Sequence, residues 1–473
     1  MVDGRELAAQ FENAADFETR KVLCGGQLLT VLFLDGLTSG GDIAEQVVRP
    51  LAQMTDEARE EVLYTRALQG GVWCASVKEP ESTQQAAELL VNGFCVILFP
   101  KSGKALGCEV KTGEKRSPSP PETENTVKGA KDAFTETLRT NTSLVRRHLR
   151  TPGLRLTETV IGKRTLTKVT VCWIDRLTDP ELPRRMQDRL SSIDIDGALS
   201  PAAIEEYVTG SRRTAFPLLE YTERTDHFCQ GLLDGQVGLL ADGLPLGYLA
   251  PVGLGRLMRS PEDRATDFFS ASMLRLLRYA ALGVSLLLPA LYAAMAMFHQ
   301  QMLPTKLLLS IIESKQNVPF STLLEVLGLL CAFELLQQAG LHLPQAVGTA
   351  VSIIGGLVVG TAAVDAKLVS PAALIVTASS GICGFTLPNR ELSDAVRLWR
   401  FVLTVLAGLW GLFGVTVGLL LLLTELAGLE SLGRSYLSPF GRAEVKGALV
   451  RPRLVRQKWR DGALKPMDDQ NQR

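Results

Sequence analysis

Four long runs without charge decide the fold of this chain: YAALGVSLLLPALYAAMAMF (279–298), AVGTAVSIIGGLVVGTAAV (346–364), LVSPAALIVTASSGICGFTLPN (368–389) and FVLTVLAGLWGLFGVTVGLLLLLT (401–424). A helix of about 20 residues spans about 30 Å, the thickness of the hydrocarbon layer of a bilayer. Between Leu276 and Gly428 only 14 of 153 residues are charged, against 86 of the other 320. This segregation of charge predicts a helical membrane domain.

A fifth apolar stretch, Thr322–Gly340, contains Glu325 and Glu334. It is interpreted as a buried crossing, a re-entrant piece or an interfacial helix, so that four to five spans are expected. A carboxylate within a membrane is a candidate functional group, whereas one at the interface is simply solvated. Nine residues separate the two glutamates, which places them on opposite faces of a helix.

Basic residues beside the spans indicate orientation, because cytoplasmic flanks are rich in lysine and arginine. Five arginines precede the first run and the tail is basic, which predicts a cytoplasmic N-terminal region and a cytoplasmic tail. Four crossings satisfy both but place Arg390, Arg397 and Arg400 outside. Five crossings place these arginines inside and the tail outside, and the sequence leaves the conflict open.

Small residues occur within two of the runs at the spacing that allows close helix packing. Gly356 and Gly360, beside Gly355, form one GxxxG motif, and Gly414 and Gly418 form another. Glycines four residues apart let a neighbouring helix approach closely, although a glycine-rich chain also produces this spacing by chance. Gly355, Gly414 and Gly418 are therefore candidate helix-packing residues.

The part of the chain before these runs contains an internal duplication. TVLFLDGLT (30–38) is similar to TVCWIDRLT (170–178), and the segment 89–98 is similar to 232–240, both at an offset of about 140 residues. Each unit is predicted to contain strands with helices between them, at 41–50 and 82–90 and again at 179–190 and 200–208. The predicted class is an α+β soluble region of two duplicated αβ subdomains, 1–125 and 126–263, followed by a multi-span helical membrane domain, 264–428, and a polar tail, 429–473.

A small basic cluster, Arg146, Arg147 and Arg150, lies beside a helical pattern at 132–149. It is interpreted as a solvated helix face, with docking onto an acidic partner surface as the alternative.

Motifs of catalysis and of metal binding are missing from the sequence, so neither an enzyme nor a bound cofactor is expected. The chain has no GxxxxGK[ST], HExxH or GxSxG motif and no CxxC pair among its eight cysteines. Lys+Arg 50 balance Asp+Glu 50, which disfavours an electrostatic nucleic-acid binder.

Many ordered motifs then resemble one family, the A subunits of bacterial spore germinant receptors, the GerA family. The motifs in the membrane half include LLLPALY (286–292), VPF (318–320), FELL (333–336), VSIIGGLVVG (351–360) and LVSP (368–371). Those in the soluble half include IGKRT (161–165), IDIDG (193–197) and YTER (221–224). The sequence departs from the family pattern at Lys315, Ser321, Gln337, Gln338 and Thr349.

The resemblance implies a subunit of the spore inner membrane that acts with a permease-like B subunit and a lipoprotein C subunit. Such A subunits are expected to form homo-oligomers, as pentamers, that open as a nutrient-gated cation channel and trigger germination. Few helices per chain and glycine-rich faces suit a ring with the pore between subunits. The predicted pore-lining residues are Thr349, Ser352, Gly356, Val359 and Gly360. A secondary transporter and a non-conducting scaffold subunit are the alternatives.

Overall fold

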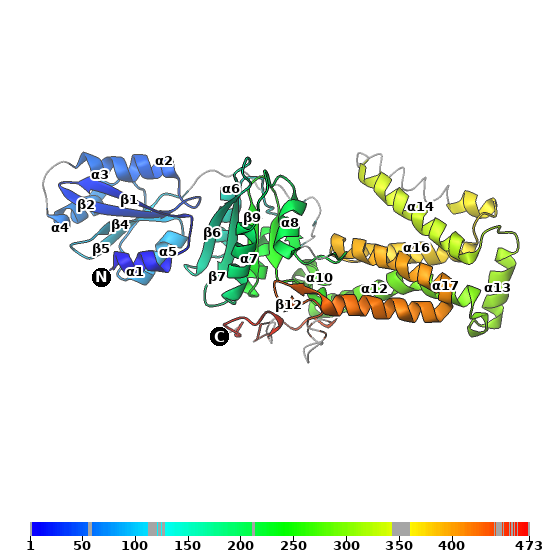
Figure 1. The fold of residues 1–473 in the computed structure, drawn as a ribbon. Helices are drawn as coiled ribbons and strands as arrows, with labels where there is room; N and C mark the ends of the chain where they lie inside the picture. The colour runs from blue at the N-terminus through cyan, green and yellow to red at the C-terminus, as the bar shows by residue number, and fades with distance from the viewer. Residues whose placement is uncertain are drawn as a thin grey trace.

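A computed structural model describes the chain except residues 1, 55–58, 112–120, 122–123, 125–127, 211–212, 343–359, 439, 441–446, 448, 454, 456, 458, 461 and 472–473. The described part forms an elongated molecule, with two αβ subdomains followed by a bundle of long helices (Figure 1). This confirms the predicted order of an αβ region and a helical region.

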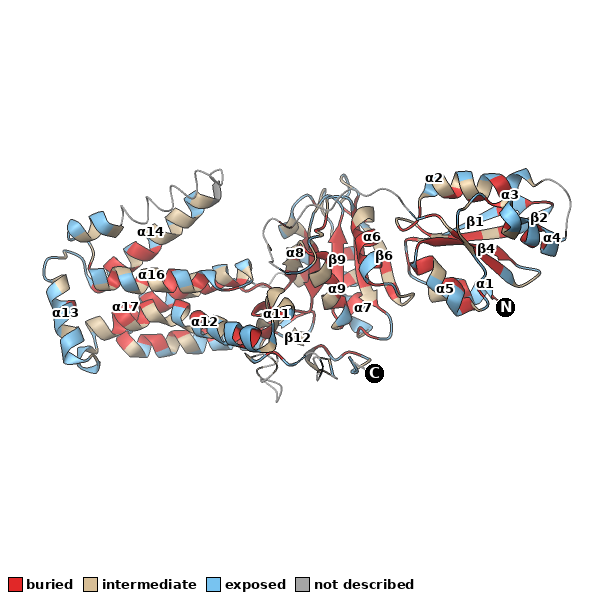
Figure 2. Cartoon of the chain, turned by 180° about the vertical axis from the view of Figure 1, so that it is seen from behind, coloured by how far each residue is buried: buried red, intermediate tan, exposed pale blue. Residues whose placement is uncertain are grey.

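The first subdomain is a five-stranded antiparallel sheet with helices on both faces. Its strand order is β1-β2-β4-β5-β3. All residues of β4 are buried, and alternate ones face opposite cores: Cys95 and Ile97 pack with α3, while Val96 and Leu98 pack with α5 (Figure 2). The elements are α1 Gly4–Gln10, β1 Phe17–Cys24, β2 Gln27–Leu34, α2 Gly40–Asp42, η1 Ile43–Val48, α3 Arg49–Gln53, α4 Glu60–Arg66, η2 Ala67–Gly71, β3 Val77–Lys78, α5 Thr83–Val91, β4 Phe94–Phe99 and β5 Lys104–Glu109.

The second subdomain repeats this topology, with the strand order β6-β7-β9-β10-β8. The similar stretches 30–38 and 170–178 begin in β2 and β7, which hold the same position in the two sheets, so the predicted duplication is confirmed. The helix that corresponds to α5 is α9, because each precedes the third strand of its sheet. The elements are α6 Leu138–His148, β6 Leu154–Ile161, β7 Thr167–Ile174, α7 Glu181–Ser191, α8 Pro201–Thr209, β8 Glu220–Thr222, α9 Thr225–Leu233, β9 Val237–Ala241 and β10 Gly247–Ala250.

The two subdomains meet along the edge strand β6. The backbone N–H of Ala15 donates to the carbonyl of Leu156 (2.8 Å), which satisfies part of an otherwise open sheet edge. Beside this pairing, the Arg146 guanidinium donates to both carboxylate oxygens of Asp16, at 2.7 Å each. Arg146 is 1% exposed, so the interpretation of its cluster as a solvated face is wrong for this residue. Arg147 and Arg150 are exposed.

A second polar pair holds the segment before α6 to the start of α9. Asp132 Oδ2 lies 2.7 Å from His148 Nε2 and accepts a hydrogen bond from the Thr225 hydroxyl. The hydrogen bond with His148 lowers the pKa of Asp132 to about 2, and the same bond raises the pKa of His148. The pair is therefore charged over a wide range of pH.

This pair predicts a pH-dependent contribution to stability. The lowered pKa of Asp132 stabilises the fold above about pH 4, and this contribution is lost as the pH falls towards 2. The raised pKa of His148 stabilises the fold below about pH 6.5, and this contribution is lost as the pH rises through the folded pKa. Replacement His148→Gln should therefore lower the Tm most between about pH 4 and about pH 6.5. A Tm difference that does not vary with pH would contradict the pairing.

The helical part contains α12 Phe268–Met297, α13 Thr305–Lys315, α14 Thr322–His342, α16 Pro371–Phe385 and α17 Arg390–Gly428, with the short helices α10 Leu254–Leu257 and α11 Glu262–Ala265 before it. Among the described residues, three helices are long and apolar enough to cross a membrane: Phe268–Met297, Thr322–Gly340 and Arg390–Gly428. The predicted run 368–389 forms α16, which at 15 residues is about 22 Å long. Most of the predicted run 346–364 lies outside the described residues.

Helix α17 is a hairpin rather than one straight helix. Gly411 has φ 60° and ψ −141°, a backbone conformation that is essentially restricted to glycine. In a straight helix Leu403 and Gly418 would lie about 22 Å apart, yet a Cβ on Gly418 would lie 2.4 Å from Leu403 Cδ2. The prediction of a single crossing at 401–424 is therefore wrong: two antiparallel arms, 390–410 and 412–428, meet at Gly411 (Figure 1).

The hairpin returns the chain to the second subdomain. After α17, the short strands β11 Glu430–Ser431 and β12 Arg434–Ser435 lie against this subdomain. The Ser431 hydroxyl donates to the carbonyl of Leu218 (2.6 Å), and the N–H of Leu254 donates to the carbonyl of Tyr436 (2.8 Å). The start of α17 lies at the same end, because Glu391 lines a cavity together with Tyr248 of β10. The first arm of α17 therefore begins, and the segment after α17 lies, at the end of the helical part that faces the second subdomain.

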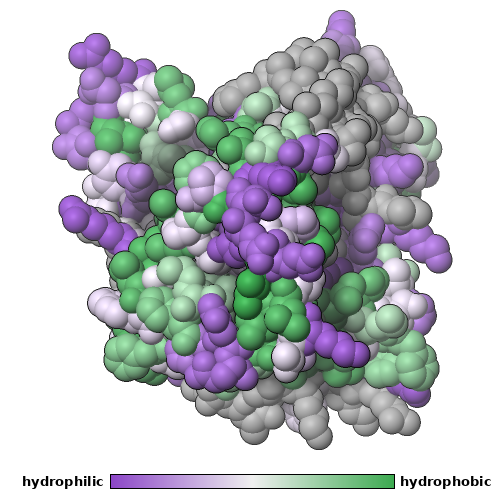
Figure 3. All heavy atoms as spheres, turned by 90° about the vertical axis from the view of Figure 1, so that its right-hand side faces the viewer, coloured by the Kyte–Doolittle hydropathy of each residue, from purple (hydrophilic) through white to green (hydrophobic). Residues whose placement is uncertain are grey.

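The surface of the helical part is apolar, as expected for contact with lipid. Most exposed large hydrophobic side chains of the described residues lie between Phe268 and Gly428. Helix α13 crosses the end of the bundle farthest from the αβ subdomains (Figure 1) and exposes Leu307, Leu309 and Ile312. Seen from this end, hydrophobic side chains surround patches of hydrophilic ones (Figure 3). This pattern is typical of a helix that lies in a membrane interface.

Candidate functional site: charged residues inside the helical part

The first charged group joins α14 to the first arm of α17. The Arg397 guanidinium lies 2.8 Å from Glu334 Oε1, and the same Nη1 donates to the side-chain oxygen of Gln337. Glu334 and Gln337 are three residues apart in α14, a spacing that places both side chains on one face of the helix. Arg397 also pairs with Asp394 on its own helix. The predicted carboxylate Glu334 thus belongs to an ion pair between two helices.

Arg400 lies one turn further along the same face of α17 and is 0% exposed. Its Nη1 donates to the Ser380 hydroxyl of α16 (3.2 Å), which in turn donates to the carbonyl of Ser285 in α12 (2.8 Å). Within the described residues no carboxylate lies at ion-pair distance from Arg400. A buried arginine without a counter-ion inside apolar helices is costly, and such residues mark ion routes and gates.

We refer to Glu334, Gln337, Arg397 and Arg400 as the charged seam. Arg397 and Arg400 entered the sequence analysis only as orientation signals. Glu334 and Gln337 are three residues apart on one apolar helix, and Arg397 and Arg400 are three residues apart on another. This spacing, which places each pair on one helix face, was the signal in the sequence that could have identified the site. Which helices meet is a property of the packing.

Glu325 forms a separate polar group near α13. Its carboxylate is 2% exposed, lies 3.5 Å from Lys315 Nζ and accepts a hydrogen bond from the N–H of Ser370. It therefore ties the start of α14 to α13 and to the N-cap residue of α16. Glu325 and Glu334 contact different elements, so the structure does not bring them into one site.

Four of the predicted pore-lining residues, Thr349, Ser352, Gly356 and Val359, and the packing residue Gly355 lie outside the described residues. Gly360 is described: a Cβ there would lie 3.6 Å from Leu374 Cδ2 of α16. The lining of a pore by this segment stays a prediction.

Gly414 and Gly418 lie in the α17 hairpin, where the second arm faces the first. A Cβ on Gly414 would lie 1.9 Å from the carbonyl oxygen of Leu406, so no side chain fits there. The close approach that their spacing permits occurs here between two arms of one helix hairpin.

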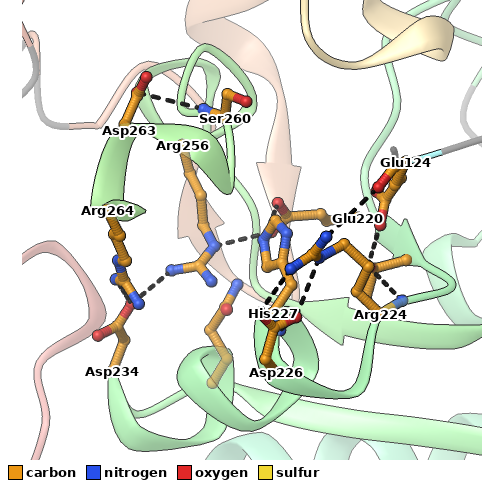
Figure 4. A network of polar contacts seen from close by, with 12 residues as sticks. Glu124, Glu220, Arg224, Asp226, His227, Asp234, Arg256, Ser260, Asp263 and Arg264 are labelled. Carbon is orange, nitrogen blue, oxygen red and sulfur yellow. Dashed lines mark hydrogen bonds and ion pairs between the residues drawn. The ribbon is translucent and has the colours of Figure 1, made fainter. Parts of the chain in front are cut away.

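A network of ion pairs joins the second subdomain to α10 and α11, which precede α12 (Figure 4). Arg256 lies between Glu220 (2.7 Å) and Asp234 (3.0 Å), and Arg264 also reaches Asp234 (3.1 Å). Next to it, Asp263 pairs with two arginines of α12, Arg275 at 3.2 Å and Arg278 at 2.8 Å. These arginines provided the predicted positive flank of the first span, and the structure shows that carboxylates hold them in place.

The electrostatics of this junction favour the charged forms. Burial would raise the pKa of Glu220, but the charges of Arg256 and His227 outweigh burial and lower it to about 2. Burial would likewise lower the pKa of Arg256, and the charges of Glu220 and Asp234 raise it instead. The junction therefore stays ionised at neutral pH. Among the described residues, no cluster of three or more His, Cys, Asp or Glu side chains is arranged to hold a metal ion.

Comparison with known proteins gives consistent matches along the chain. The family model described as Bacillus/Clostridium GerA spore germination protein matches residues 5–466. The chain is 36% identical over 439 residues to the uncharacterized membrane protein YfkQ of Bacillus subtilis (strain 168), covering 92% of this chain and 84% of that protein. It is 34% identical over 456 residues to spore germination protein KA of the same organism, covering 94% and 83%. It is 31% identical over 444 residues to spore germination protein GerLA of Bacillus cereus, covering 93% and 90%.

The comparison with solved structures also gives a match. The crystal structure of the N-terminal domain of the A subunit of the Bacillus megaterium spore germinant receptor GerK3 has a TM-score of 0.41 and is 23% identical, covering 52% of this chain and 92% of that domain.

Proposed function

This chain belongs to the GerA family of spore germination proteins, and from that premise we propose that it is a membrane subunit of a spore germinant receptor that oligomerises into a nutrient-gated cation channel. Its expected place is the spore inner membrane, with the αβ subdomains in the cytoplasm. Its expected partners are further copies of itself, as a pentamer, a permease-like B subunit and a lipoprotein C subunit.

The observation that carries the proposal is the poor coverage of α14. In its apolar window 17% of the residues are buried, against 39% in α12 and in α17. The helix also leans away from the rest of the bundle (Figures 1 and 2). A crossing helix that one chain leaves uncovered is suited to pack against a neighbouring subunit, as the helices of a ring do.

The charged seam supports ion conduction in such a ring. Glu334 lies on this same poorly covered helix, and its side chain is 30% exposed although it is paired with Arg397. Rings of carboxylates select cations in channels, because their field attracts one sign of charge. The cytoplasmic orientation is supported by the arginines before α12 and by the return of the α17 hairpin to the same side.

Flux measurements on the full-length chain, reconstituted into liposomes alone and with its co-expressed receptor partners, test the proposal. Replacement Glu334→Gln should lower potassium flux about tenfold, equivalent to about 1.4 kcal/mol, because it removes a negative charge from the path and leaves Arg397 with Asp394 alone. Glu313→Gln is the matched control, since Glu313 is exposed in α13 and should conduct as the wild type does.

The size of the solubilised complex is measured on the same sample. If the oligomer conducts no cation even with its partners, the protein acts as a scaffold subunit. If a monomer takes up one substrate saturably, the protein is a transporter. Either result would overturn the channel.

A further inference from the structure

A large cavity lies between the second subdomain and the start of α17, next to the charged seam. Its volume is about 870 Å³, within the usual range for small-molecule sites. Its described walls come from α8, residues 210 and 213–219, β8, β10 and the first two turns of α17. The residues that carry the argument are Glu205, Glu206, Tyr221, Tyr248, Glu391 and Asp394.

The walls of this cavity carry an excess of negative charge. Four carboxylates line it, those of Glu205, Glu206, Glu391 and Asp394, whereas Arg213 is the only arginine or lysine among the described lining residues. Asp394 pairs with Arg397. In the part of the chain that the structure describes, Glu205, Glu206 and Glu391 have no ion-pair partner. Such a site attracts cations.

Aromatic side chains form the rest of the polar wall. Tyr221 is half-buried, and Tyr248 is 1% exposed with its hydroxyl close to the Glu205 carboxylate. Burial raises the pKa of the Tyr248 phenol, and the nearby charge of Glu205 raises it further. Tyrosine rings beside carboxylates are the surroundings that ammonium groups prefer.

The arrangement argues against a bare metal ion. Among the described residues, no group of three or more acidic, histidine or cysteine side chains converges closely enough to hold one. The volume also exceeds what a single ion requires.

We propose that this cavity binds an organic ammonium ion, with its charge between Glu205 and Glu391 and its carbon atoms against Tyr221 and Tyr248. Glu205 belongs to α8 and Glu391 to the first turn of α17, so the bound cation would join the second subdomain to a membrane helix. Without it, the two like charges disfavour the approach of these elements. Binding does not depend on the channel proposed above, because it is measured without conductance.

Calorimetric titration of the purified full-length chain in detergent tests this site. The probes are choline and butylammonium, and the neutral control is 3,3-dimethyl-1-butanol, which has the shape of choline without its charge. Both ammonium ions should bind saturably and raise the Tm, and the neutral alcohol should do neither. Binding of neither ammonium ion, equal binding of the alcohol, or displacement by equimolar potassium would each overturn the proposal.

Variants locate the site. Glu205→Gln and Glu391→Gln should each weaken binding at least about tenfold, because each removes one charge next to the ligand. Glu181→Gln, on the exposed face of α7, is the matched control and should bind as the wild type does. If a variant fails to fold, the comparison of choline with the neutral alcohol on the wild-type chain still tests whether the protein binds ammonium ions. Wild-type affinity in folded Glu205→Gln and Glu391→Gln would place any binding elsewhere.

Discussion

Replacement Arg146→Met is expected to destabilise the αβ region by about 3–5 kcal/mol, the range measured when one partner of a buried ion pair is removed. Arg146 and Asp16 are both almost fully buried, and Arg146 donates two short hydrogen bonds to the Asp16 carboxylate. The variant leaves the Asp16 carboxylate buried without a counter-ion. Because the two residues belong to different subdomains, the loss should also loosen the contact between them.

Thermal unfolding and limited proteolysis of the full-length chain measure this effect. Arg147→Met is the matched control, since Arg147 is the next residue of the same helix, is exposed and should change stability little. The double variant Asp16→Leu/Arg146→Met should be more stable than Arg146→Met alone, because no charge remains buried. Equal losses in Arg146→Met and Arg147→Met would show that the buried pair contributes nothing beyond an exposed charge.

Replacement Gly411→Leu is expected to disrupt the α17 hairpin. The backbone conformation at Gly411 costs a side-chain-bearing residue about 1–3 kcal/mol. A Cβ at this position would also lie 2.8 Å from His299 Cε1 and 3.0 Å from Phe298 Cβ, so the loop after α12 would have to move. A leucine, in contrast, is a good helix former and favours one continuous helix.

The position of the tail reports on this change. In the wild type, a membrane-impermeant, cysteine-reactive label should reach the tail from the same side of the membrane as it reaches the αβ subdomains. In Gly411→Leu, either the two should be labelled from different sides or the Tm should fall. Gly283→Ala is the control: Gly283 lies within α12, a Cβ there meets no atom within 4 Å, and alanine should be neutral or stabilising by up to about 1 kcal/mol. A Gly411→Leu protein with wild-type stability and labelling would refute the hairpin.

Much of the architecture follows from local sequence pattern. The segregation of charge identified the helical region, and the repeat at 30–38 and 170–178 identified two related subdomains, because apolar period and strand composition act over a few residues. Contacts between distant segments were not accessible in this way. The sequence did not show that Arg146 is buried while its neighbour Arg147 is exposed. The ion-pair partner of Arg146 is Asp16, which lies 130 residues away, and no local pattern indicates this contact. The cavity at Glu205 and Glu391 is hidden for the same reason.

The sequence by itself determined the class of the protein: which residues are apolar enough for lipid, that the αβ unit occurs twice, and which glutamates lie among apolar neighbours. Tertiary structure alone decided that 390–428 folds back at Gly411, that the charged seam joins α14 to α17, and that the segment after α17 returns to the second subdomain. The physical reason is that hydropathy reports the free energy of transferring a segment from water to lipid. It does not report in which direction the segment runs, or whether the chain reverses within it. A single glycine with positive φ reverses the chain without changing that free energy, and only the packing of the two arms reveals the reversal.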